Sequence, residues 1–266
     1  MPELPEVESA VRTLRAAAEG RTITRARALH PSLRARVAPA RLRSLVGARV
    51  SRVERRGKHQ LLHLEDGRAL HAHFRMTGDW HIDRETASTP RFARAVVELD
   101  DGARVWLVDP RALSTLDVRD ETAPFNLPLG PEATDPDLRA ADLVLALARR
   151  RGAIKPALLD QKLIAGIGNI YAAESLWHAR LDPRAMAASL SHAEIGRLLA
   201  GIRSVMRRAL KGTIRFAVYD REGRPCRRCR APIVRIAQAG RSTYLCPGCQ
   251  TREARSISRA PRAARP

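Results

Sequence analysis

The sequence has no long apolar stretch, no hydrophobic leader and few aromatic residues. No apolar run approaches the roughly 18 residues that a membrane-spanning helix requires, and the acidic opening MPELPEVES is unlike a secretory or transit peptide. Aromatic residues make up 4% of the chain, so a platform of stacked rings for single-stranded nucleic acid is not expected. We therefore expect a cytoplasmic protein with no membrane span.

Lysine is also scarce, although the chain is strongly cationic. Lys and Arg number 48 against 28 acidic residues, a net charge of +20 over 266 residues. Such a surplus attracts polyanions, with nucleic acid the first candidate and an anionic membrane the second. A solvated basic surface without a partner is the alternative. Only four of these cations are lysines, which hints that a compact ammonium is needed at each position: Lys58, Lys155, Lys162 and Lys211.

Periodicity divides the chain into helical and β regions. Apolar residues spaced by three or four predict a helix over residues 4–19. Short alternating runs over residues 22–109 predict strands, and Asp66-Gly67 and Asp101-Gly102 predict hairpin turns. A segment rich in Pro, Asp and Thr follows. The pattern is then helical again, which predicts helices over residues 137–150, 154–163, 170–178 and 192–211.

These regions predict a multidomain α+β protein. Many short strands with close turns favour a sandwich or barrel, and Ala165-Gly-Ile-Gly-Asn169 predicts a tight turn that leads into a helix. The predicted division is an N-terminal β domain at 1–116, a linker at 117–136, a helical domain at 137–218, a cysteine-bearing domain at 219–250 and a disordered basic tail at 251–266.

The four cysteines form two Cys-x-x-Cys pairs near the C-terminus. Cys226 and Cys229 precede Cys246 and Cys249 by a spacing typical of a zinc ribbon, in which each pair turns two thiolates onto one metal. Two disulfides are the alternative, which a reducing compartment disfavours. Four protein ligands leave no open coordination position, so we expect one structural Zn²⁺ and a short β-hairpin between the pairs.

The N-terminus carries a candidate nucleophile. Removal of Met1 would leave Pro2 with a free secondary amine, whose pKa of roughly 8 leaves a neutral fraction at pH 7. A neutral amine can attack an electrophilic carbon and form an iminium ion, and the adjacent Glu3 can act as a general acid. Taken alone, the pair is equally typical of a helix N-terminus with Pro and Glu in its first turn.

Three features in this order resemble one family. The opening Met1-Pro-Glu-Leu-Pro-Glu-Val-Glu8, the turn Gly166-Ile-Gly-Asn-Ile-Tyr171 and the four-cysteine ribbon are similar to the formamidopyrimidine-DNA glycosylase and endonuclease VIII family, over roughly residues 1–250. The resemblance implies a β-sandwich flanked by helices, a helix–two-turn–helix domain and a zinc finger. It also implies a monomer in the nucleoid that excises damaged bases from double-stranded DNA and cleaves the strand by β- and δ-elimination.

The resemblance assigns roles to individual residues. It implies that Pro2 is the Schiff-base nucleophile at C1′ of the sugar, that Glu3 assists opening of the sugar ring, and that Lys58 contacts phosphate near the reacting sugar. Arg241, at the expected tip of the finger hairpin, is implied to bind phosphate beside the reaction site. The remaining DNA-binding candidates are His73, Arg75, Met76, Arg111, Lys155 and Asn169. Simpler interpretations are a solvated turn for Lys58, a polar strand face for His73 and a helix cap for Asn169.

Two loops depart from the formamidopyrimidine branch. An Arg, Arg75, precedes Met76 where that branch has glycine, and Asp109-Pro-Arg-Ala-Leu113 lacks the Arg and Phe that the branch places after its Asp-Pro-Arg motif. In the endonuclease VIII branch, consecutive residues of the first loop fill the void left by the everted base, which residues 75–77 match. The lesion class therefore stays open between formamidopyrimidine or 8-oxoguanine and oxidised pyrimidines. An AP lyase with weak glycosylase activity and a non-catalytic zinc-finger DNA-binding protein are the alternatives.

Overall fold

The computed structural model describes residues 1–84, 88–120 and 127–250, and the chain forms two units, Met1–Leu127 and Pro128–Pro266. The first unit opens with helix α1 (Leu4–Ala18), whose apolar residues at helical spacing are all buried. Pro5 lies in its first turn, and the Glu6 carboxylate accepts the Glu3 N–H at 2.9 Å, which begins the helix where the sequence predicts it.

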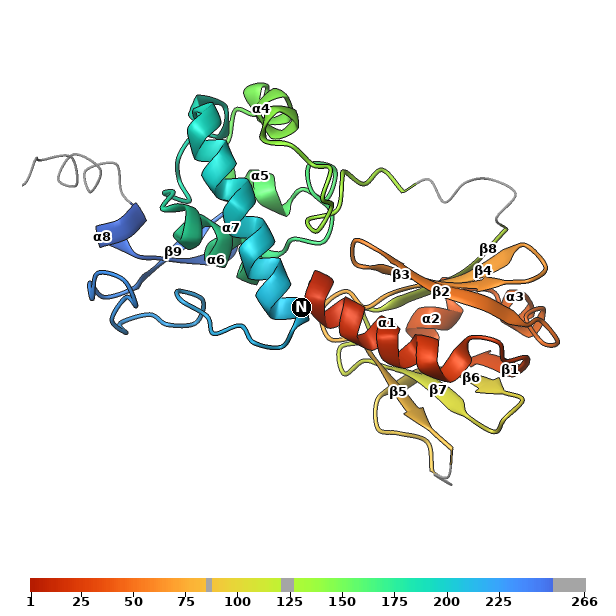
Figure 1. Cartoon of the computed structure of the whole chain (residues 1–266). Coiled ribbons are helices and arrows are strands. Elements are labelled where there is room, and N and C mark those ends of the chain that lie inside the picture. Colours follow the sequence, from red (N-terminus) through yellow and green to blue (C-terminus); the bar gives the residue numbers. More distant parts are fainter. Residues whose placement is uncertain (85–87, 121–126, 251–266) are drawn as a thin grey trace, which may run out of the picture. The chain divides into compact units, whose positions relative to one another are not determined.

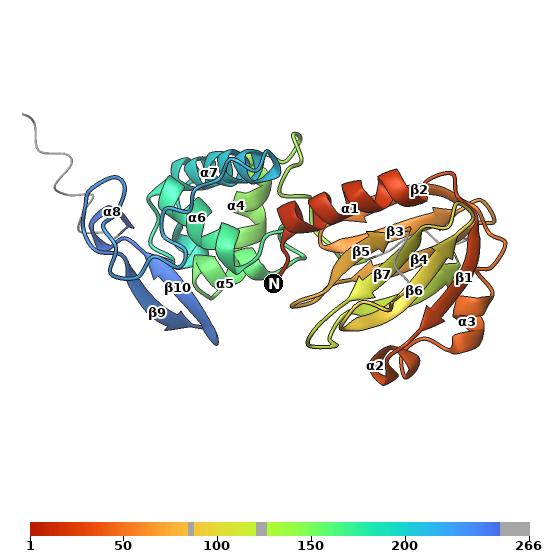
Figure 2. The same cartoon turned by 90° about the horizontal axis from the view of Figure 1, so that it is seen from below.

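Two four-stranded antiparallel sheets follow α1 (Figures 1 and 2). One has the order β1-β6-β7-β5 and the other the order β2-β3-β4-β8. The strands are β1 (Ile23–Ala28), β2 (Val50–Arg56), β3 (His59–Leu64), β4 (Arg68–His73), β5 (Asp79–Asp83), β6 (Ala93–Leu99), β7 (Arg104–Val108) and β8 (Thr115–Asp120). The predicted hairpin turns lie between β3 and β4 and between β6 and β7, with Gly67 at φ 79° and Gly102 at φ 82°.

Helices cover both open edges of this sandwich. Helix α1 contacts β2 and β5, whereas α2 (Pro31–Arg34) and α3 (Pro39–Arg43) contact β1. Apolar side chains from both sheets and from the buried face of α1 form one core between them, which includes Val11, Leu62 and Val105. The predicted β-sandwich flanked by helices is therefore confirmed.

The second unit combines a helical domain with a small β-hairpin. Its helices are α4 (Ala140–Ala148), α5 (Ile154–Leu159), α6 (Asn169–Ala179), the 3₁₀ turn η1 (Ala187–Ser189) and α7 (His192–Leu210). Strands β9 (Val234–Gln238) and β10 (Arg241–Leu245) pair antiparallel and precede the short α8 (Pro247–Gln250). Among the described residues, no helix has the length and apolar character needed to cross a membrane.

The structure differs from the predicted elements at several boundaries. Helices α2 and α3 occur where only strands are predicted, and each begins at a proline, which suits the first helical position. Strand β8 extends to Asp120, into the segment 117–136 predicted as a linker. Helix α5 ends at Leu159 rather than at residue 163. Just after it, the Asp160 carboxylate accepts the N–H of Lys162 at 2.9 Å, which forms a turn in place of a further helical turn. The tail at 251–266 lies outside the described residues.

Candidate active site, DNA-binding residues and zinc centre

Pro2 and Glu3 lie directly before the first turn of α1. Glu3 is the N-cap residue and is only 1% exposed, while Pro2 is half-buried. With Met1 attached, the Pro2 nitrogen is an amide and cannot act as a nucleophile. The position supplies an amine only after Met1 is removed, and it then places that amine beside a buried carboxyl group.

The turn between β2 and β3 is held in place by α1. Arg55 Nε donates to a Glu8 carboxylate oxygen at 2.8 Å, and Arg55 Nη1 donates to the Gly57 carbonyl at 2.9 Å. Burial raises the pKa of Glu8, but the hydrogen bonds and charges of Arg55 and Arg12 outweigh it, so its pKa is lowered. Gly57 has φ 59°, which favours glycine. Lys58 follows it and is buried, so the turn is a constrained one and not a solvated loop.

Three imidazole rings gather on the hairpin of β3 and β4. His59 pairs with His73 across the strands, and His59 Nδ1 lies 2.9 Å from His71 Nε2. Burial, with the positive charge of Arg75 and neighbouring cations, lowers the pKa of His59 to about 4. Burial and the neighbouring rings and arginines likewise lower the pKa values of His71 and His73 to about 3. The rings are therefore neutral at pH 7. The simpler interpretation of His73, as a residue on a polar strand face, did not predict this.

The loop after β4 presents the predicted void-filling residues. Arg75 adopts φ 57° and donates its backbone N–H to His73 Nδ1 at 3.0 Å. Met76 is exposed at 37%, so its apolar side chain is accessible to a binding partner. Its neighbour Thr77 donates a hydrogen bond to the buried carboxylate of Asp109. Asp109 begins the second loop, in which Arg111 is exposed.

Lys155 is enclosed within the second unit. It is only 1% exposed, and its Nζ donates to Asn169 Oδ1 at 2.6 Å, Thr243 Oγ1 at 2.7 Å and the Ser242 carbonyl at 3.2 Å. Asn169 Nδ2 also donates to the Ser242 carbonyl at 3.0 Å. Lys155 therefore braces the start of α6 against the finger strand β10, and its contact with DNA stays a prediction.

Asn169 is the first residue of α6, and Gly168 occupies the N-cap position without a side-chain cap. The helix-cap alternative for the Asn169 side chain is therefore wrong. The preceding turn forms as predicted, with Gly166 at φ 95°. Because the N-terminus of an eleven-residue helix carries partial positive charge, this position favours a phosphate.

Arg241 begins strand β10 at the tip of the finger hairpin. It pairs with Gln238 across a two-residue turn, in which Ala239 has φ 49° and Gly240 has φ 71°. The Arg241 side chain is exposed. The sequence prediction of an arginine at the hairpin tip is confirmed, and its contact with phosphate stays a prediction.

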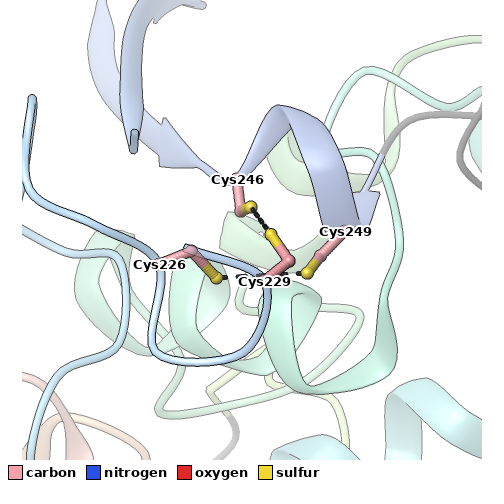
Figure 3. Close-up of side chains that lie close together, drawn as sticks. All are labelled: Cys226, Cys229, Cys246 and Cys249. Atoms are coloured by element: carbon pink, nitrogen blue, oxygen red, sulfur yellow. Dashed lines mark hydrogen bonds between the residues drawn. The ribbon is translucent and has the colours of Figure 1, made fainter. Parts of the chain in front are cut away.

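The four cysteines converge from two turns (Figure 3). Their sulfur atoms all lie within 4.8 Å of one another, with Cys229 to Cys246 at 3.3 Å and Cys226 to Cys249 at 4.0 Å. These separations exceed a disulfide bond of about 2.05 Å, and all four are free thiols. They fit a tetrahedral zinc ion with Zn–S bonds of about 2.3 Å. The four residues therefore form a structural zinc site.

The zinc site is anchored to α6. Trp177 Nε1 donates to Cys226 Sγ at 3.4 Å, and the Arg228 guanidinium lies 4.0 Å from the centroid of the Trp177 ring. Burial would raise the pKa of Cys226, but backbone and Trp177 donors outweigh it and lower the pKa to about 6, which favours the metal-binding thiolate. Glu174, one turn earlier on α6, accepts three backbone N–H groups from residues 217–219.

Each unit thus collects part of the predicted site. The first contains Pro2, Glu3, Lys58, His73, Arg75, Met76 and Arg111, and the second contains Lys155, Asn169, Arg241 and the cysteines. Sequence reasoning missed His59 and Thr243. The hairpin turn at Asp66-Gly67 could have revealed His59, because it sets residues 59 and 73 opposite each other. No local signal pairs Thr243 with Lys155.

Three family models match the chain in order. The formamidopyrimidine-DNA glycosylase N-terminal domain matches residues 1–116, the H2TH domain of the same enzymes matches residues 129–218, and a zinc finger found in FPG and IleRS matches residues 223–252. Formamidopyrimidine-DNA glycosylases of Heliobacterium modesticaldum and Paracoccus denitrificans are 40% and 38% identical, each over 94% of this chain and 100% of their own length.

Solved structures agree with this match. The Lactococcus lactis formamidopyrimidine-DNA glycosylase bound to DNA with an AP site superposes with a TM-score of 0.87 at 30% identity, over 94% of this chain and 100% of that one. A MutM complex with DNA containing carbocyclic 8-oxoguanine gives the same TM-score and coverage at 31% identity. The chain therefore belongs to the formamidopyrimidine-DNA glycosylase family, whose members are base-excision-repair DNA glycosylases that typically also have AP lyase activity.

Proposed function

We propose that this chain excises oxidised bases from duplex DNA and cleaves the resulting abasic strand, with the amine of Pro2 as nucleophile. The observation that carries the proposal is the Pro2-Glu3 pair at the start of α1, intact in a chain that matches the family over 94% of its length. The net charge of +20 supports a DNA partner.

The chemistry follows from the side chains at that position. After Met1 is removed, the neutral Pro2 amine attacks C1′ of the damaged nucleotide, and the base leaves with a proton. Opening of the sugar ring, assisted by a proton from Glu3, gives an iminium ion between Pro2 and C1′. Loss of a C2′ proton expels the 3′ phosphate, a second elimination expels the 5′ phosphate, and water hydrolyses the iminium to restore the amine.

The other candidate residues would contact the phosphates or the base stack of the DNA duplex. Lys58 and Arg241 would neutralise phosphates near the reacting sugar, with Asn169 at the N-terminus of α6 as a further contact. Arg75, Met76 and Arg111 would occupy the space left by the everted base or contact the opposite strand, with His73 beside them. We propose that Lys155 serves DNA binding indirectly, since its ammonium donates to Asn169.

Further parts of the proposal concern organisation. We propose a domain division of 1–116, 117–136, 137–218, 219–250 and 251–266, a monomeric state and a location in the cytoplasm, associated with the nucleoid.

The loop departures at Arg75, Ala112 and Leu113 support a second candidate, an AP lyase with weak glycosylase activity.

Borohydride trapping on duplex oligonucleotides tests the mechanism. The duplexes carry an abasic site, 8-oxoguanine, an oxidised pyrimidine or no lesion. We expect a covalent complex on the abasic duplex that forms much more slowly in Pro2→Gly, in which a primary amine replaces the secondary amine, and at the wild-type rate in the control Pro5→Ala, which alters the same turn of α1. Duplex affinity of Pro2→Gly, measured by fluorescence anisotropy, should equal that of the wild type.

The lesion panel separates the alternatives. Trapping on a base lesion identifies a glycosylase and its lesion class, whereas trapping on the abasic duplex alone identifies the AP lyase with weak glycosylase activity. If protein with Met1 verified as absent and zinc verified as present traps none of the duplexes, the proposal is refuted in favour of the non-catalytic DNA-binding protein.

A further inference from the structure

A single buried carboxylate contacts both the loop after β4, which carries the void-filling candidates, and the loop after β7, which carries the DNA-binding candidate Arg111. Asp109 is fully buried at the end of β7, and its Oδ2 accepts the backbone N–H groups of Leu113 and Ser114, each at 2.7 Å. Its Oδ1 accepts the N–H of Arg111 at 3.1 Å and the hydroxyl of Thr77. One side chain thus closes its own loop and reaches the loop after β4.

Both loops are constrained around this carboxylate. Ala112, inside the ring of hydrogen bonds, adopts φ 53°, which a non-glycine residue holds only when its surroundings enforce it. In the other loop, a Cβ added at Gly78 would lie 2.8 Å from the Phe74 carbonyl oxygen, so the turn that projects Met76 is tight. Arg94 Nε donates to the Asp109 carbonyl at 2.6 Å, which fixes the base of the second loop.

The electrostatics match this arrangement. Burial raises the pKa of Asp109, but the Thr77 hydroxyl and the N–H groups of Ser114, Leu113 and Arg111 outweigh it, so the pKa is lowered. The ionised carboxylate accepts all four hydrogen bonds at once. An amide has only one acceptor oxygen. In Asp109→Asn the NH₂ group would therefore replace one carboxylate oxygen and face two of these donors without accepting from them.

We propose that Asp109 is a positioning residue for base eversion: it holds the Met76 loop and the 110–114 loop in one fixed arrangement, so that they enter the duplex as a unit. The inference rests on the proposed function. Eversion of a base costs unstacking and unpairing energy that an abasic site largely avoids. Asp109 therefore matters for excision of a damaged base much more than for cleavage at a preformed abasic site.

Single-turnover kinetics on two substrates test this role. We expect Asp109→Asn to lower the rate of base excision by about 10- to 100-fold, the effect of a displaced positioning group, while borohydride trapping on the abasic duplex keeps its wild-type rate. The matched control is Asp66→Asn, which alters another Asp whose carboxylate accepts a backbone N–H two residues on, in the β3–β4 turn. It should change neither rate.

A double-mutant cycle identifies the contact between the loops. Thr77→Val removes the hydroxyl and leaves the bonds of Asp109 within its own loop in place. We expect Thr77→Val to slow base excision, and the double variant with Asp109→Asn to lose less than the two single losses combined. The exposed Thr24→Val on β1 is the control for the substitution type.

The outcomes separate this inference from the proposed function. A parallel loss of both activities in Asp109→Asn would assign the residue to the fold alone and overturn the inference, as would excision at the wild-type rate. Fully additive losses in the cycle would overturn the coupling between the loops. Failure of the wild-type protein to trap the abasic duplex would instead refute the Pro2 mechanism.

Discussion

Acidification should destabilise the first unit through the His59–His71–His73 cluster. The pKa of His59 is about 4 and those of His71 and His73 are about 3, because burial and surrounding cations oppose protonation. The charged groups that lower these values are Lys58, on the adjoining turn, Arg75, on the loop after β4, and Arg119, on β8. At pH 7 the folded and unfolded chains therefore both hold these rings mostly neutral.

The sign and size follow from linkage. Between pH 6.5 and about 4 the unfolded chain binds protons that the folded chain does not, so stability is lost as the pH falls through this window. At pH 5 an unfolded imidazole with a pKa of about 6.5 gains about 2 kcal/mol from protonation. One such ring would lower the free energy of opening by about 2 kcal/mol at pH 5, and three independent rings would lower it by about 6 kcal/mol. Because protonation of one ring disfavours protonation of its neighbours in the folded cluster, we expect a total within this range.

Hydrogen–deuterium exchange reports this local stability. Peptides from β3 and β4 should exchange through a more populated open state at pH 5.0 than at pH 7.5, after correction for intrinsic rates. His71→Asn should reduce the difference, whereas the control His81→Asn, on the exposed part of β5, should preserve it. Proton NMR of the imidazoles gives a direct check: a ring of the cluster that titrates near pH 6.5 in the folded protein would refute the reasoning.

Three more predictions concern the second unit. Chelation of zinc should unfold the finger, abolish duplex binding and change the fluorescence of Trp177, which contacts Cys226; unchanged binding after verified metal removal would contradict this. Glu174→Ala should lower the stability of the unit by about 3 to 6 kcal/mol in urea unfolding, since three buried or partly buried N–H groups lose their acceptor; Glu222→Ala, at an exposed carboxylate, is the control. Arg241→Ala should weaken duplex binding and reduce its logarithmic salt slope by about 0.9, and a slope equal to that of the wild type would exclude a phosphate contact.

Local patterns predicted the parts of this molecule whose geometry is set by near neighbours. The spacing of Cys226, Cys229, Cys246 and Cys249 is sufficient to define a four-sulfur site, because each pair and its turn bring two thiolates to one point. The capping box at Ser191 likewise fixes the start of α7, where the Glu194 carboxylate accepts the Ser191 N–H at 2.9 Å. The contacts within each Cys-x-x-Cys pair and within the capping box span only three residues, whereas the two cysteine pairs meet across 17 and 23 residues.

Long-range pairing explains what the sequence did not reveal. Strand β8 pairs with β4 across more than forty residues of chain, as in Leu70 opposite Val118, and its composition merges into the Pro- and Asp-rich segment that follows. The contact of Lys155 with Thr243 is separated by 88 residues. Scarcity of lysine marked residue 155 as special, but only the register of the finger hairpin shows which atoms its ammonium contacts.

The bracing role of Lys155 also limits how Asn169 can bind phosphate. Asn169 Oδ1 accepts from Lys155 and one Nδ2 hydrogen is donated to the Ser242 carbonyl, so the amide is oriented before DNA arrives. A phosphate at this position can then use the second Nδ2 hydrogen, in the partial positive charge at the start of α6. Because the same ammonium bonds to Ser242 and Thr243 on β10, this orientation depends on the finger being folded. Loss of zinc should therefore disturb the Asn169 contact as well as the Arg241 contact.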